Sequence, residues 1–97
     1  MKYFSYQELF RSQVALDNDI VNMPSVWRQK EVYNNLWELV ENLLDPIREK
    51  FATPMIITSG YRTEKVNDLV NGKVYSQHMK GKAVDFYFER FSKKEMA

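Results

Sequence analysis

The residues with the clearest chemistry lie in one short segment, SQHMKGKAVD, which occupies positions 76–85. It contains His78, the single histidine of the chain, and the carboxylate of Asp85 seven positions later. Neutral imidazole and carboxylate oxygen both bind zinc at about 2.0–2.2 Å, and a loop that folds back could bring both onto one ion. A lone His–Asp pair is more often a surface pair or a hydrogen-bonded loop. The spacing alone therefore leaves a metal half-site and a plain polar pair both open.

The neighbours of Asp85 predict an unusual setting for a carboxylate. Val84 and Phe86 flank it within a run of apolar residues, so the pattern predicts a buried strand position. An unpaired carboxylate is costly to bury, and such a residue needs a partner. That partner is either a bound cation or a basic side chain of this chain, for which the candidates are Arg62, Lys80 and Lys82.

A second cluster, SGYR at positions 59–62, places an arginine just after a predicted strand. The planar guanidinium of Arg62 suits a carboxylate or a developing oxyanion, but an internal salt bridge is an equally good interpretation. Basic residues outnumber acidic ones between positions 62 and 82, which favours an anionic ligand, although a solvated face is the commoner meaning of such a run.

Length and composition exclude several classes of protein. The 97 residues suit one domain, and the absence of cysteine excludes disulfides and thiol chemistry. With one histidine, a three-ligand zinc site would need two carboxylates as well. A net charge of +1 argues against a nucleic-acid binder, and no apolar run resembles a membrane span or a secretory signal. We therefore expect a protein made in the cytoplasm without a signal peptide.

The first half of the chain is predicted to be helical. Ser5 and Glu8 form a capping box that starts a short helix near Tyr6, which should end before Asp17. A long helical pattern begins near Pro24 and Ser25, and core packing is the favoured interpretation of its apolar and aromatic stripe. The stripe consists of Trp27, Tyr33, Leu36, Trp37, Val40, Leu43, Leu44, Ile47 and Phe51. Pro46 predicts a kink, or a restart of the helix with Asp45 as its cap.

The second half alternates strand and helix signals. Strands are predicted at 55–59 and 82–88, and Thr63 should cap a helix whose inner face is Val66, Leu69 and Val70. Ser92 and Glu95 form another capping box just before the last residue. Because two strands make a poor sheet, we expect a C-terminal continuation, with a short fraying tail as the alternative.

Together the two chemical clusters resemble a known family. SGYR at 59–62 and SxHxxGxAxD at 76–85, in this order and with Asn67 between them, resemble the zinc D-Ala-D-Ala carboxypeptidases of the M15 peptidase family, in the hedgehog/DD-peptidase superfamily. The segment from about 32 to 51 is also similar to short phage-type and bacterial members. The resemblance covers most of residues 3–88.

The resemblance implies a fold and a site. It implies an α+β fold with N-terminal helices, one of them long, packed on a small antiparallel sheet. His78 and Asp85 would be the first two zinc ligands, Arg62 would bind substrate or the oxyanion, and Ser76 would contact the peptide. The family's third ligand, a later histidine, and its catalytic acidic residue have no counterpart, since Glu89 and Glu95 match no such motif. We therefore expect residues 1–97 to be one M15-like domain without its C-terminal strand or strands, binding zinc weakly or not at all.

Three functions follow as hypotheses. The first is a zinc metallopeptidase that hydrolyses peptidoglycan stem peptides, as a D-Ala-D-Ala carboxypeptidase or an endolysin, inactive if the site is incomplete. Phage lysis machinery could release such a protein to the cell wall. The second is a catalytically dead M15-like binding or phage structural module. The third is a helical interaction domain with Trp27 and Trp37 facing a partner. A monomer is favoured in each case.

Overall fold

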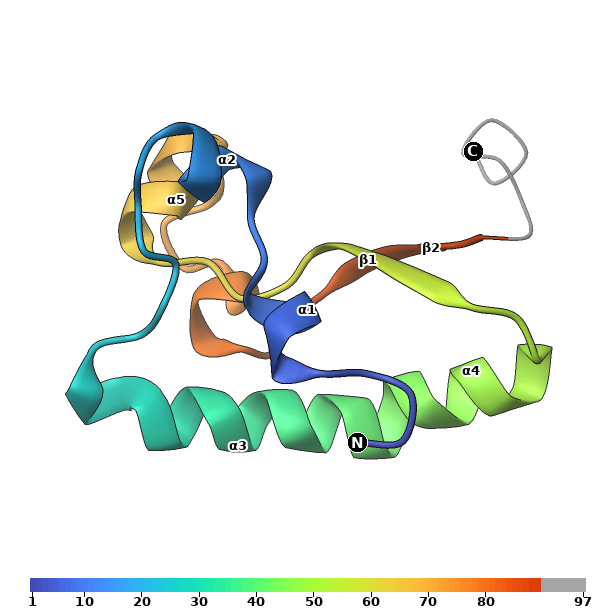
Figure 1. Cartoon of the computed structure of the whole chain (residues 1–97). Helices are drawn as coiled ribbons and strands as arrows, with labels where there is room; N and C mark the ends of the chain where they lie inside the picture. The colour runs from blue at the N-terminus through green and yellow to red at the C-terminus, as the bar shows by residue number, and fades with distance from the viewer. Residues whose placement is uncertain (90–97) are drawn as a thin grey trace.

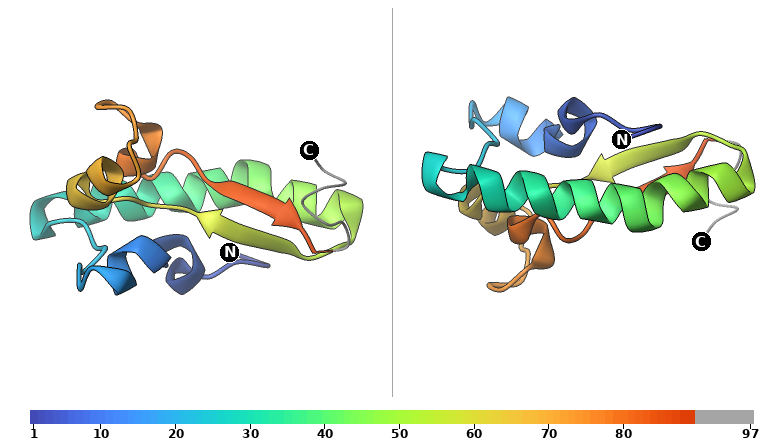
Figure 2. Two further views of the ribbon diagram at one scale, coloured as in Figure 1. Left: turned by 90° about the horizontal axis from the view of Figure 1, so that it is seen from above. Right: turned by 90° about the horizontal axis from the view of Figure 1, so that it is seen from below.

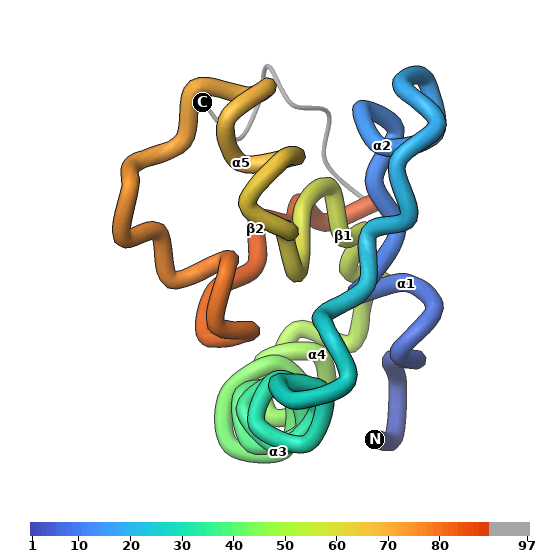
Figure 3. Tube along the Cα trace, turned by 90° about the vertical axis from the view of Figure 1, so that its left-hand side faces the viewer, coloured from blue at the N-terminus to red at the C-terminus, as the bar shows by residue number. Residues whose placement is uncertain are grey.

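A long helical rod lies along one face of a two-stranded antiparallel sheet in the computed structural model, which describes residues 1–89 (Figure 1). Short helices gather on the side of the molecule opposite the rod, as the end-on view shows (Figure 3). The predicted α+β architecture, with one long helix on a small antiparallel sheet, is confirmed. No helix within the described part of the chain is long and apolar enough to cross a membrane.

The rod has four consecutive segments: η1 Val26–Arg28, α3 Gln29–Leu39, η2 Val40–Leu44 and α4 Asp45–Phe51. Its buried apolar residues recur at intervals of four, which keeps them on one face of a helix. They are Val32, Leu36, Val40 and Leu44.

The expectation of core packing was wrong for part of the aromatic and apolar stripe. Trp27 is 94% exposed and Trp37 is 48% exposed, and Leu43 and Phe51 are exposed as well. These residues lie off the buried face, although the ring of Phe51 still contacts that of Phe88 in the sheet, with 5.2 Å between the ring centroids. The exposure of the two tryptophans is what the interaction-domain hypothesis required, but that hypothesis does not account for the polar cluster described below.

Pro46 is accommodated without a break in the rod. The five residues before α4 form a π-helical turn, in which the backbone N–H of Asp45 bonds to the carbonyl O of Val40. Such a turn relieves the clash of a proline ring with the preceding turn. The expected cap at Asp45 was wrong, because its buried carboxylate accepts instead from the backbone N–H groups of Lys2 (2.9 Å) and Tyr3 (3.2 Å).

The N-terminal helical region is two short helices, α1 Tyr6–Phe10 and α2 Gln13–Asp17, where one was expected. The predicted capping box of Ser5 and Glu8 is confirmed at the start of α1. Ser12, which was not predicted as a cap, accepts with its hydroxyl from the backbone N–H of Ala15 and caps α2.

The sheet joins β1 Met55–Ser59 to β2 Asp85–Phe88, which begins later than the predicted 82–88. Met55 pairs with Phe88 and Ser59 with Asp85, with an irregularity between Ile57 and Ser59. Figure 2 shows the two strands lying across the rod. Residues of both strands contribute to the core against the rod, so this face of the sheet is covered.

Two further helices flank the sheet. Thr63 caps α5 Glu64–Leu69 as predicted, but Leu69 is 51% exposed and Val70 is also exposed, so the predicted inner face was wrong beyond Val66. The second helix is η3 Gln77–Lys80, a short 3-10 helix that lies where a polar loop was predicted. The helix predicted from the capping box at Ser92 lies outside the described residues.

Candidate metal and substrate site

Three of the four predicted site residues meet at one end of the sheet. The Oδ2 atom of Asp85 lies 3.4 Å from Nε2 of His78 and 3.7 Å from Nη2 of Arg62. Asp85 opens β2, His78 belongs to η3, and Arg62 follows β1. Folding therefore assembles a histidine, an arginine and a carboxylate from three separate elements.

The orientation of His78 is set by its backbone surroundings. Its Nδ1 atom lies 2.8 Å from the carbonyl O of Gly60. A carbonyl can only accept, so Nδ1 carries a proton, and Nε2 is the ring atom turned toward Asp85. The side chain is only 12% exposed. Histidines that bind metals are commonly held in this way, with the second ring nitrogen donating to a backbone carbonyl.

The space between His78 and Asp85 fits a small cation. In neutral His78, Nε2 presents a lone pair to a carboxylate oxygen, and this arrangement is favourable only when a proton or a cation lies between them. Two ligand atoms at about 2.0–2.2 Å from a tetrahedral ion are about 3.3–3.5 Å apart, which matches the observed distance. The pair is therefore suitable as two zinc ligands.

A third ligand is absent from the part of the chain that the structure describes. Within residues 1–89, no group of three or more His, Cys, Asp or Glu side chains is close enough to hold a metal ion. Structural zinc sites use four protein ligands and catalytic sites three. His78 and Asp85 are thus two candidate ligands within the described residues, without a third beside them.

The setting of Asp85 differs from the prediction. Its side chain is 60% exposed, where a buried carboxylate was expected. Successive side chains of a strand point to opposite faces, and Phe86 and Phe88 contact the core. Asp85 therefore projects from the open face of the sheet. Among the described residues its ion-pair partners are Arg62 and His78, and neither Lys80 nor Lys82 takes that role.

The guanidinium of Arg62 is held by several polar groups. Its Nε donates to Ser59 Oγ (3.2 Å) and its Nη1 to Asn67 Oδ1 (3.4 Å), while Nη2 faces Asp85. Its backbone N–H donates to the carbonyl O of His78 at 3.0 Å. The side chain is 17% exposed. Of the two alternatives left open by the sequence, the structure shows the internal ion pair with Asp85, and anion binding by Arg62 stays a prediction.

Asn67 supports this arrangement from α5. It is 1% exposed, and its Nδ2 donates to the carbonyl O of Lys73 at 2.9 Å while its Oδ1 accepts from Arg62. One side chain therefore holds both the arginine and the loop that leads to Ser76. From the sequence alone, Asn67 was known only by its position between the two motifs, without a role.

Ser76 lies beside the site as the N-cap of η3. Its hydroxyl accepts from the backbone N–H of His78 at 3.2 Å. At the other end of η3, Gly81 has φ 75°, and a Cβ there would come within 2.9 Å of the carbonyl O of Val32. Glycine is therefore required for η3 to pack closely on α3. The predicted contact of Ser76 with substrate stays a prediction.

Three polar residues that the sequence analysis missed also position the site. Arg28 donates to the carbonyl O of Met79 (3.1 Å) and Asn35 to that of Lys80 (2.8 Å), which ties η3 to the rod. The buried Asn22 donates to the carbonyl O of Tyr61 at 2.8 Å. Their neighbours in the sequence carry no motif, so no local signal marks them.

Tyr61 carries the buried side chain of the SGYR turn. Burial raises the pKa of its phenol above the ordinary tyrosine value, and the nearby charge of Arg28 opposes this shift weakly. Its backbone N–H donates to the carbonyl O of Leu9 at 2.8 Å. The turn that carries Arg62 is therefore packed against α1.

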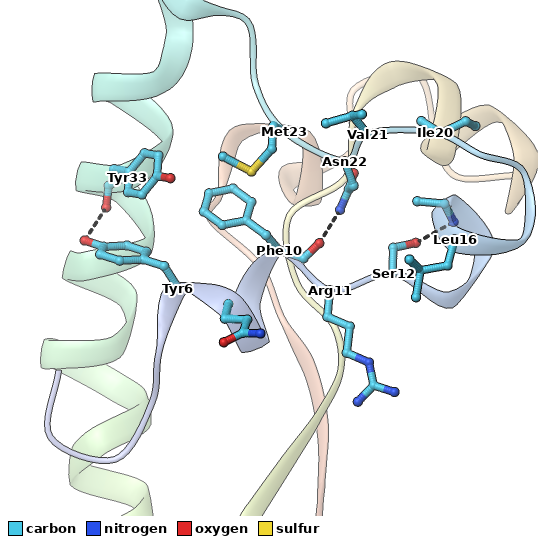
Figure 4. A pocket seen from close by; sticks show the side chains of 12 residues that line it. Tyr6, Phe10, Arg11, Ser12, Leu16, Ile20, Val21, Asn22, Met23 and Tyr33 are labelled. Carbon is cyan, nitrogen blue, oxygen red and sulfur yellow. Dashed lines mark hydrogen bonds between the residues drawn. The ribbon is translucent and has the colours of Figure 1, made fainter.

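One large hollow on the described surface is not lined by His78, Asp85 or Arg62. It has a volume of about 700 Å³ and lies between α1, α2 and the rod, where Tyr6, Phe10, Met23 and Tyr33 supply an aromatic and apolar wall (Figure 4). Two smaller hollows, of about 200 and 260 Å³, lie along β1, and the smaller one includes Ser59 and Arg62. His78 and Asp85 line none of these three hollows, whereas Arg62 lines the smallest one.

A family model described as peptidase M15 matches residues 2–97. The chain belongs to the peptidase M15 family. The resemblance seen in the two motifs is thereby confirmed, and a peptide is the class of substrate that M15 membership implies. No curated protein and no solved structure matches the chain. The M15 motifs are the same residues that the fold brings together at the end of the sheet.

Proposed function

We propose that this chain is a zinc-dependent peptidase domain that hydrolyses peptidoglycan stem peptides, of the D-Ala-D-Ala carboxypeptidase or endolysin type. One observation carries the proposal: Nε2 of His78, oriented by Gly60, lies 3.4 Å from Oδ2 of Asp85 with the guanidinium of Arg62 alongside. Membership in the M15 family supports a peptide as the substrate.

Each residue has a distinct role in the proposal. His78 and Asp85 would hold the zinc ion, which when bound polarises a carbonyl and lowers the pKa of a water to about 7. Arg62 would offset negative charge that develops on the carbonyl oxygen of the scissile bond. Ser76, at the start of η3, would contact the peptide. Because Ser59 and Asn67 already hold Arg62, little reorganisation is needed during the reaction.

The alternative function is a catalytically inactive M15-like binding or structural module. It is favoured by the two-ligand count within residues 1–89, since a site with two protein ligands binds zinc weakly. The two functions differ in zinc affinity and in peptide hydrolysis, so both quantities need to be measured on the same protein.

Calorimetric titration with zinc separates the two functions. The peptidase proposal predicts one-to-one binding at micromolar affinity or tighter, lost in His78→Ala and in Asp85→Asn. Asp68→Asn is the matched control, because Asp68 is an exposed carboxylate on α5 that lies away from the site. Circular dichroism should show that all variants remain folded.

Hydrolysis is the second readout. Mass spectrometry of peptidoglycan fragments should show loss of D-alanine or cleavage within the stem peptide, and this activity should be lost in Arg62→Ala. Zinc binding without hydrolysis, or the absence of zinc binding by the folded wild type, would favour the inactive module.

A further inference from the structure

Arg11 is a guanidinium without a partner in a polar groove. It follows α1 directly and is exposed, and it has no hydrogen bond or ion pair with any other residue in the range 1–89. In Figure 4 its side chain extends away from the aromatic wall of the large hollow. The residue lies at the edge of that large hollow and also lines both small hollows along β1.

These two hollows lie next to each other along β1. Both are lined by Arg11, Gln13 and Thr58, so they are contiguous. The first continues to Ser59 and Arg62, and the second continues to Ile56 and Tyr87. We call the two together the β1 groove.

The β1 groove adjoins the His78–Asp85 pair. Thr58, which lines both hollows, donates from Oγ1 to the backbone carbonyl O of Asp85 at 3.2 Å. Arg62 also belongs to both features, because it lines the groove and faces the carboxylate of Asp85. A peptide whose scissile bond lies at the His78–Asp85 pair could therefore extend into the groove.

The positive charge of the residues that line the β1 groove favours the binding of an anion. Neither hollow is lined by an aspartate or a glutamate, and both charged lining residues are arginines. The guanidinium of Arg62 is already engaged with Ser59, Asn67 and Asp85. Arg11 therefore supplies the guanidinium whose donors are free, and a guanidinium fork binds a carboxylate in bidentate fashion.

We propose that Arg11 binds a free carboxylate of the peptide ligand in the β1 groove and so makes the protein prefer peptides that carry one. The inference rests on the proposed function for its substrate class, because it assigns a specificity residue to that peptide site. The carboxylate can be the C-terminal one or that of an acidic side chain, and the test distinguishes these two sources.

The test is a titration followed by ¹H–¹⁵N NMR on zinc-free protein, so that binding is measured without hydrolysis. The probes are N-acetyl-D-alanyl-D-alanine, its C-terminal amide, and N-acetyl-D-glutamyl-D-alaninamide, whose single carboxylate is on the side chain. Wild-type protein should bind at least one of the two acids about fivefold more tightly than the amide without a carboxylate. The acid that is preferred identifies the source of the carboxylate.

Variants then assign the preference to Arg11. Arg11→Gln should bind acid and amide equally, whereas Arg11→Lys should keep part of the preference because it retains the charge without the fork. Lys30→Gln removes one exposed positive charge on α3, outside the groove, and should bind as the wild type does.

Equal binding of all three probes by wild type, no binding of any, or a preference that survives in Arg11→Gln would overturn the inference. Failure of the proposed function is recognised separately. If the protein neither binds zinc nor hydrolyses peptide but shows an Arg11-dependent carboxylate preference, the peptidase proposal fails and the role of Arg11 stands.

Discussion

The imidazole of His78 and the backbone carbonyl of Gly60 are joined by a hydrogen bond of 2.8 Å that spans 18 positions of the chain. It links the two motifs directly, because Gly60 belongs to SGYR and His78 to the segment at 76–85. A second bond, from the backbone N–H of Arg62 to the carbonyl O of His78, runs between the same two segments at 3.0 Å. These two hydrogen bonds therefore hold the SGYR segment and the segment at 76–85 in position against each other.

The first prediction concerns the tautomer of His78. In metal-free protein, at a pH where the imidazole is neutral, the proton should reside on Nδ1, since the Gly60 carbonyl can only accept. Long-range ¹H–¹⁵N correlation spectra distinguish the two tautomers, and the single histidine makes the assignment unambiguous. A neutral ring protonated mainly on Nε2, as free imidazole side chains usually are, would contradict the assigned orientation.

The second prediction concerns Asn67. Asn67→Ala should lower the free energy of unfolding by about 1–3 kcal/mol, because the carbonyl O of Lys73 and the guanidinium of Arg62 each lose the buried Asn67 side chain as a partner. Urea denaturation measures the change. Asn34→Ala, at an exposed position of α3, is the control and should stay within about 0.5 kcal/mol of wild type.

Asn67→Asp refines the same prediction. This variant keeps an acceptor for Arg62 and loses the donor to Lys73. The loss of stability should therefore be local to the loop at 71–76. Hydrogen exchange should then be faster at the backbone N–H of Ser76, which is bonded to the carbonyl O of Lys73. A loss of stability in Asn67→Ala no larger than that of the Asn34→Ala control would show that Asn67 does not hold the site.

The third prediction concerns alkaline pH. Burial raises the pKa of Tyr61, so in the unfolded state, where the pKa is about 10, the phenol loses its proton at lower pH than in the folded state. The folded state thus binds more protons, and the free energy of unfolding should fall as pH rises from about 10 toward the folded pKa. Tyr61→Phe should make this fall shallower, without abolishing it, since burial raises the pKa of Tyr6 too.

Absorbance at 295 nm reports the same group directly. The difference between wild-type and Tyr61→Phe titrations should show a tyrosine that ionises above the ordinary value while the protein remains folded. A difference curve with its midpoint at or below about 10 would contradict the burial of Tyr61.

Local signals predicted much of the backbone correctly. The capping box at Ser5, the cap at Thr63 and the strand at 55–59 all depend on residues within a few positions of one another, and all three are confirmed. Predictions that depended on which face of an element is covered were less reliable. Trp27 and Asp45 show this, because the tryptophan is exposed and the carboxylate binds the N-terminal segment in place of capping a helix.

The candidate site shows the same division between sequence and structure. Residue types and motif spacing determined that the chain carries an imidazole, a carboxylate and a guanidinium suited to metal-assisted peptide chemistry, and they identified the M15 family. Only the tertiary structure decided that His78, Asp85 and Arg62 meet, that Asp85 faces the open side of the sheet, and that Arg11 lines a groove beside them. The physical reason is that these distances depend on β1 pairing with β2 and on η3 packing against α3, which bring together segments distant in the chain.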